Sequence, residues 1–157
     1  MKVFIRGKSK NLSKKEIRAA VRFFADKLLS SRLKKYITVY ITYNLDLPIP
    51  AIIYDDDDGK MRTFHITVSQ HLGKRKELLA IAHETVHIKQ AATGQWKQKN
   101  GKSLWNGEVF NDEDTEEDYW QSPIEIDAYG REVGLYEMYM LSMKAKKNET
   151  FYRRRAR

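Results

Sequence analysis

Two histidines and a glutamate stand at a spacing that could hold a metal ion. His83, Glu84 and His87 form an HExxH motif inside a segment whose apolar residues recur at helical spacing. Residues four apart on a helix share one face, about 5.4 Å apart along the axis, so both imidazoles can reach one ion. Glu84 is rotated by about 100° from His83, so its carboxylate lies outside the same tetrahedron but can reach a water on the metal.

The chemistry that this motif favours is zinc-dependent hydrolysis. Imidazole suits zinc, and zinc lowers the pKa of a bound water to about 7, so that a neighbouring carboxylate can accept its proton. We therefore predict Zn²⁺ as the cofactor, His83 and His87 as two of its ligands, and Glu84 as the general base.

A catalytic zinc needs a third protein ligand and keeps one position open. The chain has no cysteine, and its other histidines, His65 and His71, do not continue the motif, which leaves a carboxylate. The two candidates are Glu125 and Asp127, which lie about 200° apart around a predicted helix, so only one can face the metal. The longer side chain favours Glu125, because it can span the roughly 8–10 Å between packed helix axes. Asp127 is the alternative.

The segments HETVHIKQ (83–90) and YWQSPIEIDAYGRE (119–132) resemble small gluzincin-type metallopeptidases. These include the SprT-like proteins often encoded by bacteriophages and the ImmA/IrrE-type peptidases. The resemblance covers roughly residues 60–140 and implies a short sheet before the HExxH helix. It also implies that a following helix supplies a ligand Glu from an E-x-x-A pattern, here Glu125 to Ala128. The resemblance implies that the protein hydrolyses a peptide or protein substrate. It also agrees with a virus-encoded enzyme that acts in the host cytoplasm.

Other groups near the predicted site could act on the substrate. Tyr119, Tyr129 and His65 are candidates to donate a hydrogen bond to the developing oxyanion, with ordinary packing as the alternative for each. The strand at 65–68 could be a sheet edge on which a peptide adds by β-augmentation, or simply part of the core. An acidic stretch at 112–118 could repel acidic peptides, attract basic ones or cover the site.

Hydrophobic periodicity predicts the elements that position these residues within one α+β domain. The expected fold is a compact zincin-like domain over residues 1–146, with a short twisted sheet, the HExxH helix and a following ligand helix. A basic tail at 147–157 follows it. The patterns predict strands at 3–6, 36–43, 51–54 and 61–68, a turn at 55–60, a loop at 95–118, and helices at 13–31, 73–94 and 123–146.

The composition excludes several classes of protein. With 157 residues, 41% of them apolar, the chain can bury the core of one domain. The lack of cysteine excludes disulfide frameworks, thiol nucleophiles and Cys-ligated zinc. No segment approaches the roughly 18 apolar residues of a membrane span. We expect a cytoplasmic, monomeric protein that does not engage membranes.

The net charge of +8 is concentrated at the two ends of the chain. Residues 1–35 contain twelve Lys or Arg against two acidic residues, and residues 144–157 contain seven against one. Because phosphate neutralisation dominates nucleic-acid binding, a weak nucleic-acid contact through the basic N-terminal helix and tail is one interpretation. The competing hypothesis for the whole protein is a nucleic-acid-associated binding module with a structural or vestigial zinc site. A solvated helix face and a frayed tail would explain the same charge.

Overall fold

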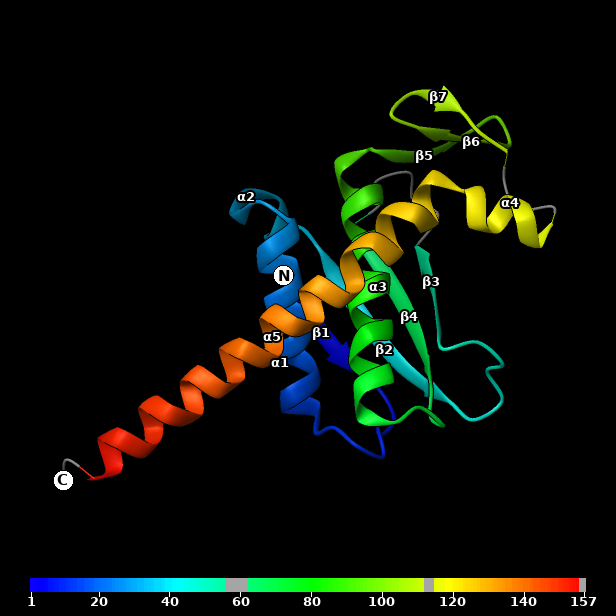
Figure 1. The fold of residues 1–157 in the computed structure, drawn as a ribbon. Coiled ribbons are helices and arrows are strands. Elements are labelled where there is room, and N and C mark those ends of the chain that lie inside the picture. The colour runs from blue at the N-terminus through cyan, green and yellow to red at the C-terminus, as the bar shows by residue number, and fades with distance from the viewer. Residues whose placement is uncertain (56–61, 112–114, 156–157) are drawn as a thin grey trace.

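A four-stranded mixed sheet forms the centre of the molecule (Figure 1). The structure, a computed structural model, describes residues 1–55, 62–111 and 115–155. Three strands run parallel and β3 is antiparallel to β4, so the predicted α+β class is confirmed. The strand order is β1 (Lys2–Ile5), β2 (Thr38–Asn44), β4 (Thr63–Ser69) and β3 (Ala51–Asp55).

β4 is an interior strand of this sheet. It pairs with β2 on one side and with β3 on the other, so of the two interpretations of residues 65–68 the open sheet edge is wrong and the core strand is confirmed. The alternating pattern of a strand shows which residues face the core, but it does not show which strands lie beside it. The edge on this side of the sheet is β3.

Two helices, α1 (Lys14–Leu28) and α3 (Lys74–Thr93), pack on one face of the sheet. Burial alternates along β2 and β4, as in a sheet covered on one side. α1 begins at the capping box of Ser13 and Glu16 and ends before residue 31, where the short helix α2 (Ser31–Lys34) begins. The inward side chains form one core that includes Ile17, Phe24, Val39, Ile41, Phe64, Ile66, Ile81 and Val86.

The HExxH helix α3 is buried on nearly all sides, because it lies between the sheet and α5 (Pro123–Arg155), which crosses it (Figure 1). α3 ends at Gly94, as the sequence predicts. The φ of Gly94 is 74°, a left-handed conformation that glycine adopts easily at the end of a helix. α5 begins at Pro123 but continues to Arg155 instead of ending near residue 146. Residues 147–155 contain no Pro or Gly to stop the helix, and this end projects from the body of the molecule (Figure 1).

The segment predicted as a loop at 95–118 contains a second sheet and a short helix. Both hairpins of this sheet turn at an Asn-Gly pair, Asn100-Gly101 and Asn106-Gly107, and all four residues have positive φ. The type I′ hairpin turn needs positive φ at both of its central residues, and Asn-Gly is its strongest sequence signal. The two pairs would have predicted the hairpins that hydrophobic periodicity misses. The elements are β5 (Trp96–Lys99), β6 (Lys102–Trp105), β7 (Glu108–Val109) and α4 (Glu116–Gln121).

Two predicted features fall wholly or partly outside the described residues. The turn at 55–60 lies there except for Asp55, the last residue of β3, and the acidic stretch at 112–118 lies there up to residue 114. The rest of that stretch opens α4, where Thr115 caps the helix. Within the described part of the chain, none of the helices has the length and apolarity needed to cross a membrane.

A buried carboxylate fastens the start of α3 to the sheet. Glu77, only 2% exposed, accepts hydrogen bonds from the Tyr43 hydroxyl at 2.7 Å and from Ser9 Oγ at 2.8 Å. Burial, and then the hydrogen bond to Glu77, raise the pKa of Tyr43, so its hydroxyl stays protonated and donates. These contacts tie β2 and the loop before α1 to the helix that carries the HExxH motif.

We expect Tyr43→Phe to lower the free energy of unfolding by about 1.5–3 kcal/mol, because a buried carboxylate then loses one of its two donors. Urea denaturation measures the change. Tyr36→Phe is the matched control, since Tyr36 is 65% exposed and should change stability by less than about 0.5 kcal/mol. Equal stability of the Tyr43→Phe protein and the wild type would contradict the importance of this contact.

Candidate metal centre

The packing of α3 against α5 brings the predicted ligands together. His83 and His87 lie on the face of α3 that meets α5, and Glu125 lies in the first turn of α5. Ala128, one turn after Ile124, is fully buried at this contact, and its small side chain lets the two helices approach closely. All three side chains are buried, and together they form a group that could hold a metal ion.

The distances within this group suit a small tetrahedral ion. Nε2 of His83 and Nε2 of His87 are 3.1 Å apart, and they lie 3.2 and 3.3 Å from the two carboxylate oxygens of Glu125. In a tetrahedral zinc site with bonds of about 2.0–2.1 Å, neighbouring ligand atoms are about 3.3 Å apart. The triangle therefore has the size that a zinc ion requires.

Hydrogen bonds on the far side of each ring fix how the imidazoles present their nitrogens. The side-chain N–H of Gln90 donates to the carbonyl of Ile124 at 2.9 Å, which turns Gln90 Oε1 toward His87 Nδ1, also at 2.9 Å. His83 Nδ1 donates in the same way to Glu132 Oε2 at 2.9 Å. With both Nδ1 atoms acting as donors, the neutral rings present their Nε2 lone pairs to each other. Two lone pairs this close need a positive charge between them.

The electrostatics of the cluster favour such a charge. Burial disfavours a charged imidazole, but hydrogen bonds to Glu125 and Glu132 outweigh it and raise the pKa of His83 to about 9. The pKa of His87 is raised against burial as well, chiefly through Glu125. Burial would raise the pKa of Glu125, yet the hydrogen bonds from both histidines hold it well below its usual range. The cluster thus attracts positive charge, either protons or a metal ion.

Glu84 lies beside the triangle without belonging to it. Its side chain is buried, with 5% of the residue exposed, and it acts electrostatically on His83, His87 and Glu125. Burial raises the pKa of its carboxyl group, while the nearby charges of His87 and His83 oppose the shift. The position of Glu84 outside the triangle agrees with its expected rotation of about 100° from His83 around the helix.

Two tyrosines border the cluster. The Tyr119 hydroxyl donates to Glu125 Oε2 at 2.9 Å and lies 3.1 Å from the Tyr129 hydroxyl. The ring of Tyr129 packs edge-on against His83, with centroids 4.6 Å apart. Burial and the hydrogen bond with Tyr129 raise the pKa of Tyr119, so its hydroxyl stays protonated and remains a donor.

Two other candidates lie away from the triangle. His65 alternates with the buried Phe64 along β4, so it points to the sheet face opposite α3, where its ring stacks on Tyr40. It is therefore not positioned to donate to an oxyanion at the cluster. Asp127 accepts hydrogen bonds from Arg131 at 2.6 Å and from Gln90 at 3.2 Å. These partners hold its carboxylate away from the histidines, on a different side of α5 from Glu125.

The sequence interpretation missed Gln90 and Glu132, the partners of the two imidazoles. Spacing could have suggested both. Gln90 lies three residues after His87 and therefore on the same side of α3. Glu132 lies seven residues after Glu125, two turns further along the same face of α5. Hydrogen-bonding to the second ring nitrogen is a usual requirement of histidine ligands, so residues at these spacings are candidates for it.

No family model, curated protein or solved structure matches this chain. The geometry of the cluster therefore carries its functional interpretation.

The structure predicts that substitutions of Glu125 and Asp127 affect zinc affinity differently. We expect Glu125→Ala to weaken zinc binding by more than about 100-fold, because it removes one corner of the triangle. Asp127→Ala, the matched control on the same helix, loses contacts to Gln90, Lys89 and Arg131 but no member of the triangle, and it should weaken binding by less than about tenfold. Competition titration with a zinc chelator measures both. The reverse order would assign the third ligand to Asp127.

Zinc uptake should release protons at neutral pH. In the metal-free protein His83 has a pKa of about 9, so below that pH a proton must leave before the nitrogen can bind metal. The apparent zinc affinity should therefore rise with pH up to about 9 and then level off. Calorimetry in buffers with different ionisation heats counts the released protons. Glu132→Gln should release fewer, since the raised pKa depends partly on that carboxylate. Uptake at pH 7 without proton release would contradict the prediction.

Proposed function

We propose that the protein is a zinc-dependent metallopeptidase with a zincin-like arrangement, as the resemblance to gluzincin-type peptidases implies. The observation that carries this proposal is the buried triangle of His83, His87 and Glu125, with Glu84 beside it and outside it. Three ligands leave a tetrahedral position open for chemistry, and a buried carboxylate that is not a ligand can move a proton there.

A zinc ion bound to His83, His87 and Glu125 would polarise the scissile carbonyl and lower the pKa of a water molecule to about 7. Glu84 accepts the proton of the attacking water and returns it to the leaving amine. Burial of Glu84 supports both steps, because it raises the pKa of the carboxyl group toward the pH at which the enzyme works. A group whose pKa is near that pH can both accept and release a proton.

Tyr119 is the better of the two remaining candidates for oxyanion stabilisation. Its hydroxyl lies against the ligand Glu125 and stays protonated, so it can turn a donor toward developing negative charge. Tyr129 orients it through the 3.1 Å contact between the two hydroxyls. A peptide substrate would pair with β3, which is the edge strand of the sheet and lies beside α3.

The competing hypothesis of a structural zinc site is less well supported. A structural zinc is normally enclosed by four protein ligands. In the part of the chain that the structure describes, three groups converge on one point, and the nearby Glu132 is used on the far side of the His83 ring. The missing fourth protein ligand favours a catalytic role.

Replacing the general base tests this function directly. Glu84→Gln should bind zinc within about threefold of the wild type, because Glu84 is not a ligand, yet lose about 10²–10⁴-fold in hydrolysis. The assay incubates zinc-loaded protein with unfolded polypeptides and identifies the fragments by mass spectrometry. Asp127→Ala serves as the control that retains activity. Undiminished cleavage by the Gln variant would remove Glu84 from the mechanism, and zinc-loaded wild type that cleaves no polypeptide would refute the proposed function.

A further inference from the structure

Three aromatic rings form a stack on the sheet face opposite α3. Phe4 of β1, Tyr40 of β2 and His65 of β4 are directly opposite one another in the strand register. The rings of Phe4 and Tyr40 are 5.1 Å apart and inclined by 18°, and those of Tyr40 and His65 are 5.0 Å apart and inclined by 12°. The rings therefore stand upright, face to face, in a row across three strands.

The stack ends at Phe4 with one ring face open. β1 is an edge strand, so Phe4 has a neighbouring ring on the β2 side only, and it is 45% exposed. Arg6, which directly follows β1, places its guanidinium 5.8 Å from the centre of the Tyr40 ring. An exposed aromatic ring at the open end of a stack, with a cation beside it, is a site on which another flat ring can continue the stack.

A line of cations on α1 follows the same sheet edge. Lys14, Arg18 and Arg22 are spaced by four residues, so they lie on one side of the helix and span about 12 Å along its axis. Lys14 donates to the carbonyl of Ile5 at 3.2 Å and Arg18 to that of Val3 at 3.3 Å, which places both beside β1. These bonds hold positive charge along the free edge of the strand that carries Phe4.

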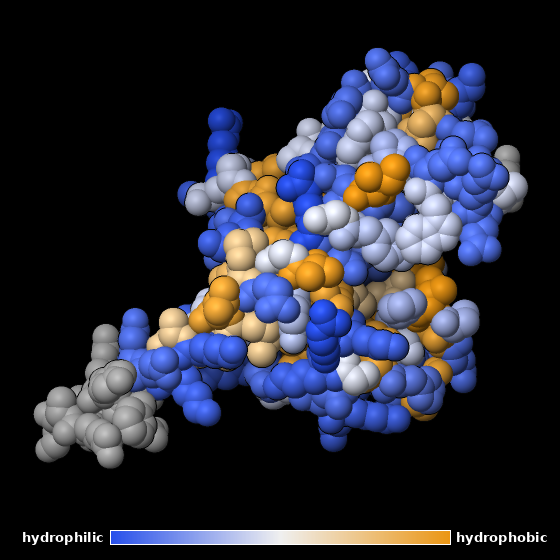
Figure 2. All heavy atoms as spheres, viewed as in Figure 1, coloured by the Kyte–Doolittle hydropathy of each residue, from blue (hydrophilic) through white to orange (hydrophobic). Residues whose placement is uncertain are grey.

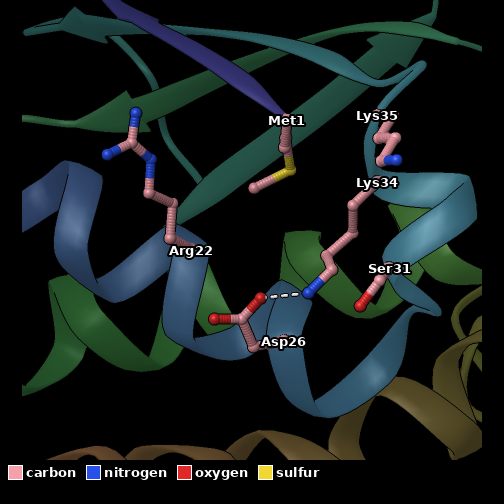
Figure 3. A pocket seen from close by; sticks show the side chains of 6 residues that line it. All are labelled: Met1, Arg22, Asp26, Ser31, Lys34 and Lys35. Atoms are coloured by element: carbon pink, nitrogen blue, oxygen red, sulfur yellow. Dashed lines mark hydrogen bonds and ion pairs between the residues drawn. The ribbon is translucent and has the colours of Figure 1, made fainter.

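The line leads into a cavity of about 310 Å³ between α1 and α2. Figure 3 shows Arg22 on one side of this cavity, Lys34 and Lys35 on the other, and Met1 between them. Lys34 is paired with Asp26, the single carboxylate of the lining. Arg22 and Lys35 make no ion pair or side-chain hydrogen bond with any residue that the structure describes, so their charges are available to a ligand.

Acidic residues of the same region do not neutralise this charge. Residues 1–35 contain two carboxylates, and both are already engaged: Asp26 with Lys34, and Glu16 with Ser13 and Lys74. This region therefore presents an unbalanced row of cations along the edge strand whose Phe4 ring is exposed. We name Phe4, Lys14, Arg18, Arg22 and Lys35 the β1–α1 surface.

We propose that the β1–α1 surface binds single-stranded nucleic acid, with an unpaired base stacked on Phe4 and successive phosphates on the cations of α1 and the cavity. Phosphates supply the charge that Lys and Arg neutralise, and stacking on an aromatic face is open only to a base outside a duplex. An anionic membrane would attract the cations. It offers no flat ring, however, that could stack on the open face of Phe4, which points along the sheet. This surface does not include His83, His87 or Glu125, which lie where α3 packs against α5, so the inference does not depend on the peptidase proposal.

The test is binding of a fluorescein-labelled oligothymidylate of about 15 nucleotides, which covers the site size of most single-strand binding folds. Fluorescence anisotropy with the full chain should show affinity that falls linearly on a log–log plot against salt. Arg22→Gln with Lys35→Gln should make that slope shallower by about 1.4, since two phosphate contacts are lost. Lys99→Gln with Lys102→Gln is the charge-matched control on the second sheet and should leave the slope unchanged.

Substitutions of Phe4 separate stacking from charge. Phe4→Ala should weaken binding by about fivefold or more, and Phe4→Trp should restore it, because the ring face is what the base uses. Phe4→Leu keeps an apolar side chain for folding and should lose affinity like the Ala variant; thermal unfolding checks that each variant is folded. Equal affinity of Phe4→Ala and wild type, equal affinity for a duplex of the same length, or displacement of the oligonucleotide by phosphatidylserine vesicles would each overturn the proposal.

Discussion

The close approach of two imidazole nitrogens, 3.1 Å apart in a buried contact between two helices, is the constraint on which the centre of this structure depends. Buried polar groups need partners, and here each outer ring nitrogen has one, Glu132 for His83 and Gln90 for His87. Those bonds turn the inner nitrogens toward each other and toward Glu125. The polar contact between α3 and α5 is therefore satisfied when a positive charge, either a proton or a metal ion, occupies its centre.

The rest of the fold holds α3 in the position that this contact requires. Glu77 joins its start to β2 through Tyr43, and the left-handed Gly94 ends it before the second sheet. Ala128 permits α5 to cross closely over it. Because α3 is packed against the sheet on one side and α5 on the other, its two histidines have little freedom to separate, and a site with fixed ligands binds a metal ion without the cost of ordering them.

Two regions of the molecule differ in the character of their side chains. On the side of the helices lies the metal cluster, surrounded by the carboxylates of Glu84, Glu125 and Glu132. The stacked aromatic rings lie on the opposite face, and cations of α1 lie beside the β1 edge. Figure 2 shows hydrophilic side chains over most of one face of the molecule, with hydrophobic ones gathered in smaller patches along α5 and near its N-terminal end. Carboxylates and cations thus gather on different parts of one small domain.

Local features of the sequence were sufficient to predict the helix that carries His83 and His87, its end at Gly94, the capped start of α1, and the facing of the two histidines, because each depends on residues within one or two turns. The Asn-Gly pairs carried equally local information about the second sheet. Side-chain length and the resemblance favoured Glu125 over Asp127, but only the tertiary structure decided which side of α5 packs on α3 and so which carboxylate meets the histidines. It also decided that β4 is an interior strand, that His65 faces away from the cluster, and that Phe4 ends a ring stack. Those outcomes depend on contacts between segments far apart in the chain, and no periodicity within a segment records which neighbour it will have.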